Sequence, residues 1–164
     1  MILGMTTFTF VHVLLSLVAI ASGLIVALGL VGGKRMDGLT ALFLTTTVLT
    51  SVTGFMFPYH GFTPGIGVGI ISMVVLAIAI YARYPKQMSG GWRKTYVVTG
   101  MIALYLNVFV LIVQSFEKVP ALHALAPTQK EPPFAIAQVT AMLIFIVWTV
   151  LAAKRFHSQS LATA

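Results

Sequence analysis

Few side chains in this sequence can do chemistry, and their types limit what that chemistry is. The 164 residues include four histidines, three carboxylates and no cysteine. The lack of cysteine excludes disulfides, thiolate metal ligands and a cysteine nucleophile. Imidazoles that converge with a carboxylate can bind zinc, copper or iron, and histidines on facing helices can ligate haem b. A histidine or carboxamide beside an aromatic wall can instead bind a quinone carbonyl.

The spacing of these residues matches no short catalytic motif. The sequence has no HxxxH or HExxH pair and no Ser/His/Asp arrangement that can be argued. The glycine-rich run of residues 65–69 follows no predicted strand and lacks the rest of a dinucleotide-binding fingerprint. We therefore expect a protein that is not an enzyme.

Composition indicates the solvent that surrounds the chain. Hydrophobic residues make up 59% of it and charged residues only 8%, whereas soluble domains carry about 25% charged residues. This small number of charged side chains cannot cover a protein surface in water. The apolar residues must therefore face lipid. The basic residues that give the net charge of +7 lie in short loops, without an arginine-rich arm or a basic face interleaved with aromatics. We therefore exclude nucleic acid as a partner.

Five apolar stretches without Asp, Glu, Lys or Arg in their interiors are long enough to cross a bilayer, which takes about 20 residues. Glycine, proline and charge separate them. The chain is predicted to be an all-α polytopic membrane protein, with five transmembrane helices in one bundle and a single domain over residues 1–164. The predicted spans are residues 8–31, 39–57, 65–84, 96–116 and 134–153.

Basic residues are divided unequally between the two sides of this bundle. The loops between spans 1 and 2 and between spans 3 and 4, with the C-terminal tail, hold eight of the ten, and the other side holds two that glutamates balance. The positive-inside rule makes the basic side cytoplasmic, with the N-terminus outside and the C-terminus inside. The eight basic residues are Lys34, Arg35, Arg83, Lys86, Arg93, Lys94, Lys154 and Arg155.

This topology brings polar residues from separate spans to the outer half of the bundle. Asn107 and Gln114 share one face of the fourth span, and both are expected to point inward because an unpaired carboxamide in hydrocarbon costs several kcal/mol. His12 in the first span is a functional hypothesis by default, since it is titratable and lies within a span. These residues predict a small-ligand pocket, lined by His12, Tyr59, Asn107, Gln114 and Gln138.

Two kinds of cofactor suit such a pocket. A metal ion could be held by His12, His60, His123 and Glu117, although their spacing is long-range. Alternatively, a redox protein could bind haem b through His12 and His60, or contact quinone through His12 with Gln114 and Gln138.

A structural alternative stays open for every polar residue. Small and hydroxylated side chains lie at helical spacing in several spans, as do His12, Ser16, Ala19 and Gly23 in the first. Polar groups in membrane helices commonly hydrogen-bond a neighbouring helix. The chain would then be a purely structural subunit, with other membrane subunits or a second copy as partners.

The connection between the fourth and fifth spans, residues 117–133, is the longest and contains four prolines. It is expected to be semi-rigid, and it can cap the polar pocket or dock a partner.

Three stretches carry a resemblance. Residues 50–55 (TSVTGF), 103–109 (ALYLNVF) and 125–134 (LAPTQKEPPF) resemble small, uncharacterised bacterial inner-membrane proteins. The resemblance implies bacterial inner-membrane origin and no particular activity. With the orientation that the basic residues give, the N-terminus is then expected in the periplasm and the C-terminus in the cytoplasm. The lone histidine early in the first span is similar to that of small haem- or metal-handling membrane proteins.

Overall fold

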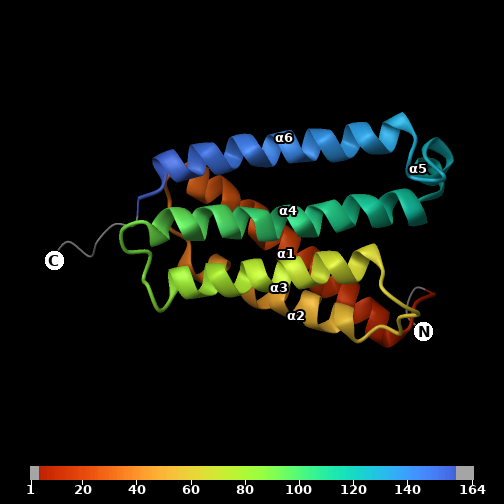
Figure 1. Cartoon of the computed structure of the whole chain (residues 1–164), viewed down its shortest axis with the longest axis horizontal. Coiled ribbons are helices and arrows are strands. Elements are labelled where there is room, and N and C mark those ends of the chain that lie inside the picture. The colour runs from red at the N-terminus through yellow and green to blue at the C-terminus, as the bar shows by residue number, and fades with distance from the viewer. Residues whose placement is uncertain (1–3, 158–164) are drawn as a thin grey trace.

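Six α-helices make up most of the chain. The computed structural model describes residues 4–157 (Figure 1). Each predicted span coincides with one long helix, and the largest difference is at the fourth, which begins at Trp92 rather than at residue 96. The helices are α1 (Thr7–Val31), α2 (Asp37–Phe55), α3 (Pro64–Arg83), α4 (Trp92–Lys118), α5 (Pro120–Leu125) and α6 (Pro132–Arg155).

The five long helices have the length and the hydropathy needed to cross a membrane. They lie along one axis, with the beginning of the chain at one end and its last described residues at the other (Figure 1). The predicted fold class is confirmed: the protein is an all-α membrane bundle. The short helix α5 lies where α4 is connected to α6, in the longest predicted loop.

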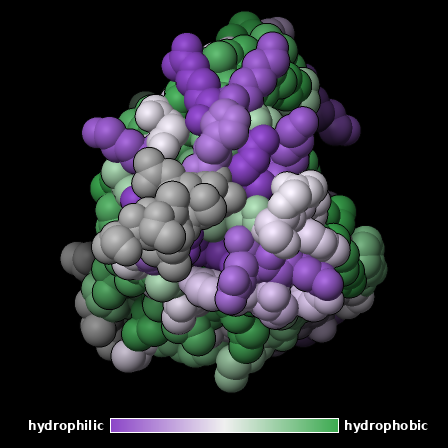
Figure 2. All heavy atoms as spheres, turned by 90° about the vertical axis from the view of Figure 1, so that its left-hand side faces the viewer, coloured by the Kyte–Doolittle hydropathy of each residue, from purple (hydrophilic) through white to green (hydrophobic). Residues whose placement is uncertain are grey.

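The two ends of the bundle differ in composition. One end is formed by residues 32–36, the end of α3, residues 84–91, the first turn of α4 and the last turn of α6. We call it the basic end because all eight basic residues predicted to share a side lie there. The other, the N-terminal end, consists of the start of α1, residues 56–63 and α5. Viewed onto the basic end, hydrophilic residues gather in the centre, with apolar residues around them (Figure 2).

Local sequence explains where several helices begin and end. The hydroxyl of Thr6 accepts a hydrogen bond from the Thr9 amide at 3.2 Å, and so caps the start of α1. Thr63 caps α3 in the same way, ahead of Pro64 at the first helical position. After α1, Gly33 adopts a φ of 73°, which costs glycine little and ends the helix.

The buried core lies towards the basic end. In α1 the first buried residue is Ala19, twelve residues after the helix begins. In α3 every buried residue lies between Ser72 and Arg83. The helix α6 buries only Phe145 and Ala152 of its 24 residues. In the other half of the bundle, the helices therefore bury few of their side chains.

A close approach of three helices at Gly23 holds this core together. A Cβ atom at Gly23 of α1 would lie 2.5 Å from Cδ1 of Leu104 in α4 and 2.8 Å from Cδ2 of Phe43 in α2. Both neighbours are 2% exposed or less, so neither has free space to move into. Small residues allow such contacts between membrane helices. The predicted first-span face therefore packs helices around Gly23.

We expect Gly23→Ala to lower the thermal unfolding midpoint of the purified protein in detergent by several degrees. The added methyl group overpacks the core, which typically costs about 1–3 kcal/mol. The matched control is Gly38→Ala in α2, where a Cβ would meet nothing within 4 Å. Equal midpoints for the two variants would contradict the close packing at Gly23.

Candidate functional site

His12 joins α1 to α2. Its Nδ1 atom lies 2.7 Å from Oγ1 of Thr53, and its ring meets that of Phe57 edge-on, with centroids 5.1 Å apart. The Thr53 hydroxyl also donates to the carbonyl of Leu49 at 2.7 Å. Since a hydroxyl has one hydrogen, the donor between the two side chains is the Nδ1–H of His12. This histidine therefore serves as an interhelical contact.

Asn107 and Gln138 also point into the bundle, each towards a different helix. Asn107 of α4 donates to the hydroxyl of Thr47 in α2 at 3.4 Å. Gln138 of α6 donates to the backbone carbonyl of Phe109 in α4 at 3.3 Å. The three inward polar groups thus link three pairs of helices and make no hydrogen bonds to one another.

The expectation that Gln114 faces the interior is wrong. Its side chain is exposed, and it donates to Glu117 of its own helix at 3.5 Å. It lies one turn from the end of α4, where water rather than hydrocarbon can satisfy a carboxamide. Tyr59 is likewise exposed, and its hydroxyl donates to the carbonyl of Gly54 at 2.5 Å.

The four residues considered as metal ligands do not assemble. His60 is exposed in the loop between α2 and α3. Nδ1 of His123, on α5, lies 3.3 Å from the carbonyl oxygen of Phe116. Across residues 4–157, no three histidine, aspartate or glutamate side chains are placed to share a metal ion. The candidate ligands lie on separate segments of the N-terminal end: α1, the loop after α2, the end of α4, and α5.

Two buried polar atoms of the interior have no partner among the described residues. They are Oγ1 of Thr50, in α2, and Oε1 of Gln138. The small cavity of about 10 Å³ in the core lies elsewhere, between Gly23, Phe43, Tyr96 and their neighbours. None of the residues predicted to line the ligand pocket lines this cavity.

The loop before α6 is ordered by its own polar contacts. The carboxamide of Gln129 donates to the carbonyl of Val113 in α4 at 3.0 Å. The Thr128 hydroxyl donates to Glu131 at 2.8 Å, and this hydrogen bond lowers the pKa of the Glu131 carboxyl. These contacts hold residues 126–131 in a fixed path, in keeping with the semi-rigid connection that the prolines predict.

The least expected site lies at the basic end, around Arg83. The side chain of this arginine is 3% exposed, although it ends a helix next to a loop. One Nη group pairs with Asp37 of α2, and the other donates to the sulfur of Met88 at 3.7 Å. The guanidinium also lies 5.0 Å from the ring centroid of the buried Tyr96. A buried arginine at membrane depth marks a functional hypothesis, with Asp37 as its partner.

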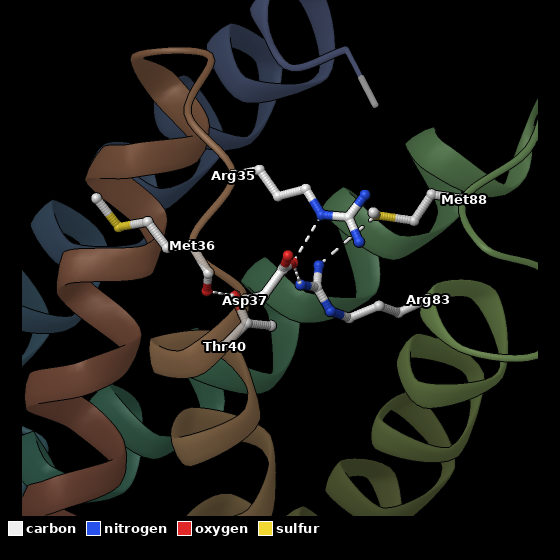
Figure 3. Close-up of polar contacts among 6 residues, drawn as sticks. All are labelled: Arg35, Met36, Asp37, Thr40, Arg83 and Met88. Carbon is white, nitrogen blue, oxygen red and sulfur yellow. Dashed lines mark hydrogen bonds and ion pairs between the residues drawn. The ribbon is translucent and has the colours of Figure 1, made fainter. Parts of the chain in front are cut away.

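Asp37 is shared by two guanidinium groups. Arg35 donates from Nε to the same carboxylate oxygen that Arg83 contacts, at a distance of 2.6 Å (Figure 3). The carboxylate is 62% exposed, so it bridges the buried arginine to the surface. Two positive charges and one negative charge leave this group, which we call the arginine pair, with a net charge of +1.

Backbone conformation brings Met88 over Arg83. Gln87 and Met88 have φ values of 49° and 55°, in the left-handed region that residues with a Cβ rarely adopt. The amide of Met88 donates to the carbonyl of Ala82 at 2.9 Å, and this bond closes the end of α3. The turn thereby buries the Met88 side chain to 1% exposure and excludes water from one side of the guanidinium.

A second arginine connects α4 to α6 at the same end. Nη1 of Arg93 donates to the carbonyl of Ala153 at 3.0 Å and to that of Phe156. These carbonyls end α6 and lack helical partners, and a cation suits the negative end of the helix dipole. Phe156 is fully buried beside this contact. The basic end is therefore held by side-chain contacts between α2 and α3 and between α4 and α6.

The arginine pair can bind anions but is unsuited to acid–base catalysis. An arginine stays protonated at all physiological pH values, and its donors match carboxylate and phosphate oxygens. From the sequence, Arg35 and Arg83 entered only the count of basic residues that sets the orientation. A usable signal was present, because Asp37 is the one acid predicted for a side with eight basic residues.

Comparison of the chain with protein-family models, with curated proteins and with solved structures finds no match.

We expect Asp37→Ala to destabilise the protein by about 1–3 kcal/mol. The substitution leaves Arg83 buried without a counter-charge. Because Asp37 is exposed, the loss of folding free energy should stay below the ~3–5 kcal/mol typical of breaking a fully buried pair. Arg83→Met should cost less, and Asp37→Ala should then add little in the Arg83→Met background.

This double-mutant cycle is read from thermal or denaturant unfolding in detergent. Glu117→Ala is the control, since that carboxylate is exposed at the opposite end of the bundle. Additive losses in the double variant would show that the two charges are not coupled.

Proposed function

We propose that the protein is a non-catalytic subunit of a membrane complex in the bacterial inner membrane, with its N-terminus in the periplasm and its C-terminus in the cytoplasm. In this proposal α6 packs against a transmembrane helix of another membrane protein. The orientation is supported by the gathering of hydrophilic and basic residues at one end of the bundle (Figure 2). The bacterial origin is supported by the resemblance of residues 50–55, 103–109 and 125–134.

The observation that carries this proposal is the burial of α6. Only 6% of the residues in its most apolar segment are buried, against 22–44% in the other four long helices. Within the chain α6 packs mainly on α4. Side chains along one face of it, including Ile136, Leu143 and Val147, are more than half exposed. Because so little of α6 is buried within its own chain, this helix has the most surface left to bury against a partner in the same membrane.

The polar interior supports a structural role over the alternatives. His12, Asn107 and Gln138 each hydrogen-bond a different neighbouring helix, which is the common use of such residues in membrane bundles. Quinone contact through His12 required Gln114, which is exposed and bonded to its own helix. Haem b required His60 on a rigid helix facing His12, and His60 lies in an exposed loop. We therefore favour the subunit over a ligand-binding or redox protein.

Photo-crosslinking in living cells tests the subunit proposal. A photoreactive phenylalanine analogue at Leu143 or Val147 of α6 should give one discrete adduct with another membrane protein. The same analogue at Ile71 or Val74, on the exposed face of α3, is the matched control and should give none. Lack of any α6 adduct would contradict the proposal, and an adduct of two identical chains would replace it with self-association.

The absence of cysteine allows orientation to be tested with single-cysteine variants. In intact cells with a permeabilised outer membrane, an impermeant maleimide should label His60→Cys and not Ser89→Cys. The reason is that the loops carrying these exposed residues lie at opposite ends of the bundle. Both variants should be labelled after cell lysis, which shows that each thiol is reactive. Labelling of Ser89→Cys alone in intact cells would reverse the proposed orientation.

A further inference from the structure

A groove runs along the outside of the bundle between α2 and α3. It has a volume of about 380 Å³ and is largely apolar. In the five-helix bundle it opens towards the lipid rather than into the core, since Ala41, Leu49 and Tyr84 are all exposed. The groove is lined by Ala41, Leu44, Thr45, Val48, Leu49, Ile80 and Tyr84.

The groove leads directly to the arginine pair. Asp37, Ala41, Thr45 and Leu49 follow one another at intervals of four residues, so they form one ridge of α2. On the α3 side, the guanidinium of Arg83 lies 5.7 Å from the ring centroid of Tyr84, which is the last residue lining the groove. The mouth of the groove at the basic end therefore lies one helical turn from the carboxylate of Asp37, to which Arg35 and the buried Arg83 are bonded.

The charge at this mouth is not neutralised by the residues that the structure describes. Asp37 balances one of the two guanidinium groups, which leaves +1. Arg35 is exposed and uses only its Nε for Asp37, and its two Nη groups make no hydrogen bond within residues 4–157. These donors are free to bind phosphate oxygens. The mouth thus offers a positively charged, hydrogen-bonding site at the end of an apolar groove.

The dimensions of the groove match a lipid chain. From Ala41 to Leu49 the ridge rises about 12 Å, close to the ~15 Å hydrocarbon depth of one leaflet. An extended acyl chain can therefore lie along the apolar lining over most of the depth of one leaflet.

We propose that this groove binds an anionic phospholipid of the leaflet at the basic end. One acyl chain lies along the α2 ridge, and the phosphate is held by the Nη groups of Arg35, with the charge of Arg83 behind it. An anionic lipid is favoured over a zwitterionic one because it also neutralises the remaining positive charge. Tyr84 lies at the level of the headgroup, where aromatic residues are common in membrane proteins. This inference does not depend on the subunit role proposed above.

Native mass spectrometry of the full chain, released from detergent in the presence of phosphatidylglycerol or phosphatidylcholine, tests the proposal. The wild-type chain should retain phosphatidylglycerol in preference to phosphatidylcholine. Arg35→Gln should reduce retention of phosphatidylglycerol several-fold, because it removes the phosphate donors. Ala41→Leu should reduce it as well, because the larger side chain fills the groove.

Two matched controls separate this site from general membrane affinity. Lys94→Gln removes an exposed charge at the same end, on α4, which does not line the groove. Ala21→Leu enlarges an exposed alanine on α1, away from the groove. Both should retain phosphatidylglycerol as the wild-type chain does. Thermal unfolding of each variant in lipid-free detergent shows whether its fold is intact.

Several results would overturn the proposal. Equal retention of the two lipids by the wild-type chain would remove the role of charge. Unchanged retention in Ala41→Leu would place the lipid outside the groove. Complete displacement by glycerol phosphate would show a headgroup site without a bound acyl chain. A second polypeptide retained in place of lipid, and lost in Ala41→Leu, would assign the groove to a protein partner.

Discussion

The guanidinium group of Arg83 carries a positive charge, and its position in the bundle leaves the side chain only 3% exposed. Such a group is stable only where the surrounding protein supplies a counter-charge and hydrogen-bond acceptors. The chain provides these from three places: a carboxylate at the start of α2, a thioether from the loop after α3, and the ring of Tyr96 in α4. The ends of α2, α3 and α4 are thereby fixed relative to one another around one side chain.

The same constraint organises the remainder of the basic end. Arg93 satisfies the final carbonyls of α6, and the turn at Gln87 and Met88 adopts an unfavourable backbone conformation that covers Arg83. The buried core begins next to these contacts and continues towards the N-terminal end as far as the close contact at Gly23. The described part of the N-terminal half has no comparable group of charged contacts. There, single hydrogen bonds from His12, Asn107 and Gln138 connect the helices in pairs. The bundle is thus most tightly packed at one end and most exposed to its surroundings along α6.

These differences divide the molecule into surfaces suited to different partners. The face of α6 is apolar and broad, which suits another helix in the membrane. The groove between α2 and α3 is largely apolar and lies one helical turn from an unbalanced positive charge, which suits a lipid with a negative headgroup. Histidine, the residue type on which catalytic or metal chemistry would depend, is used for helix contact at His12 and lies exposed at His60, His123 and His157.

The sequence by itself determined the spans and the imbalance of charge, because both depend on the local run of residues. An apolar stretch of about 20 residues needs a bilayer whatever its neighbours are. It could not determine which polar groups meet. Rotation of each helix about its axis depends on contacts between distant residues, such as Gly23 with Leu104, and this rotation turned Asn107 inward. Gln114 lies on the same face of α4, but it is near the end of the helix, where its side chain is exposed. The burial of Arg83 was decided in the same way, because it requires Asp37, 46 residues earlier in the chain, to reach it from another helix.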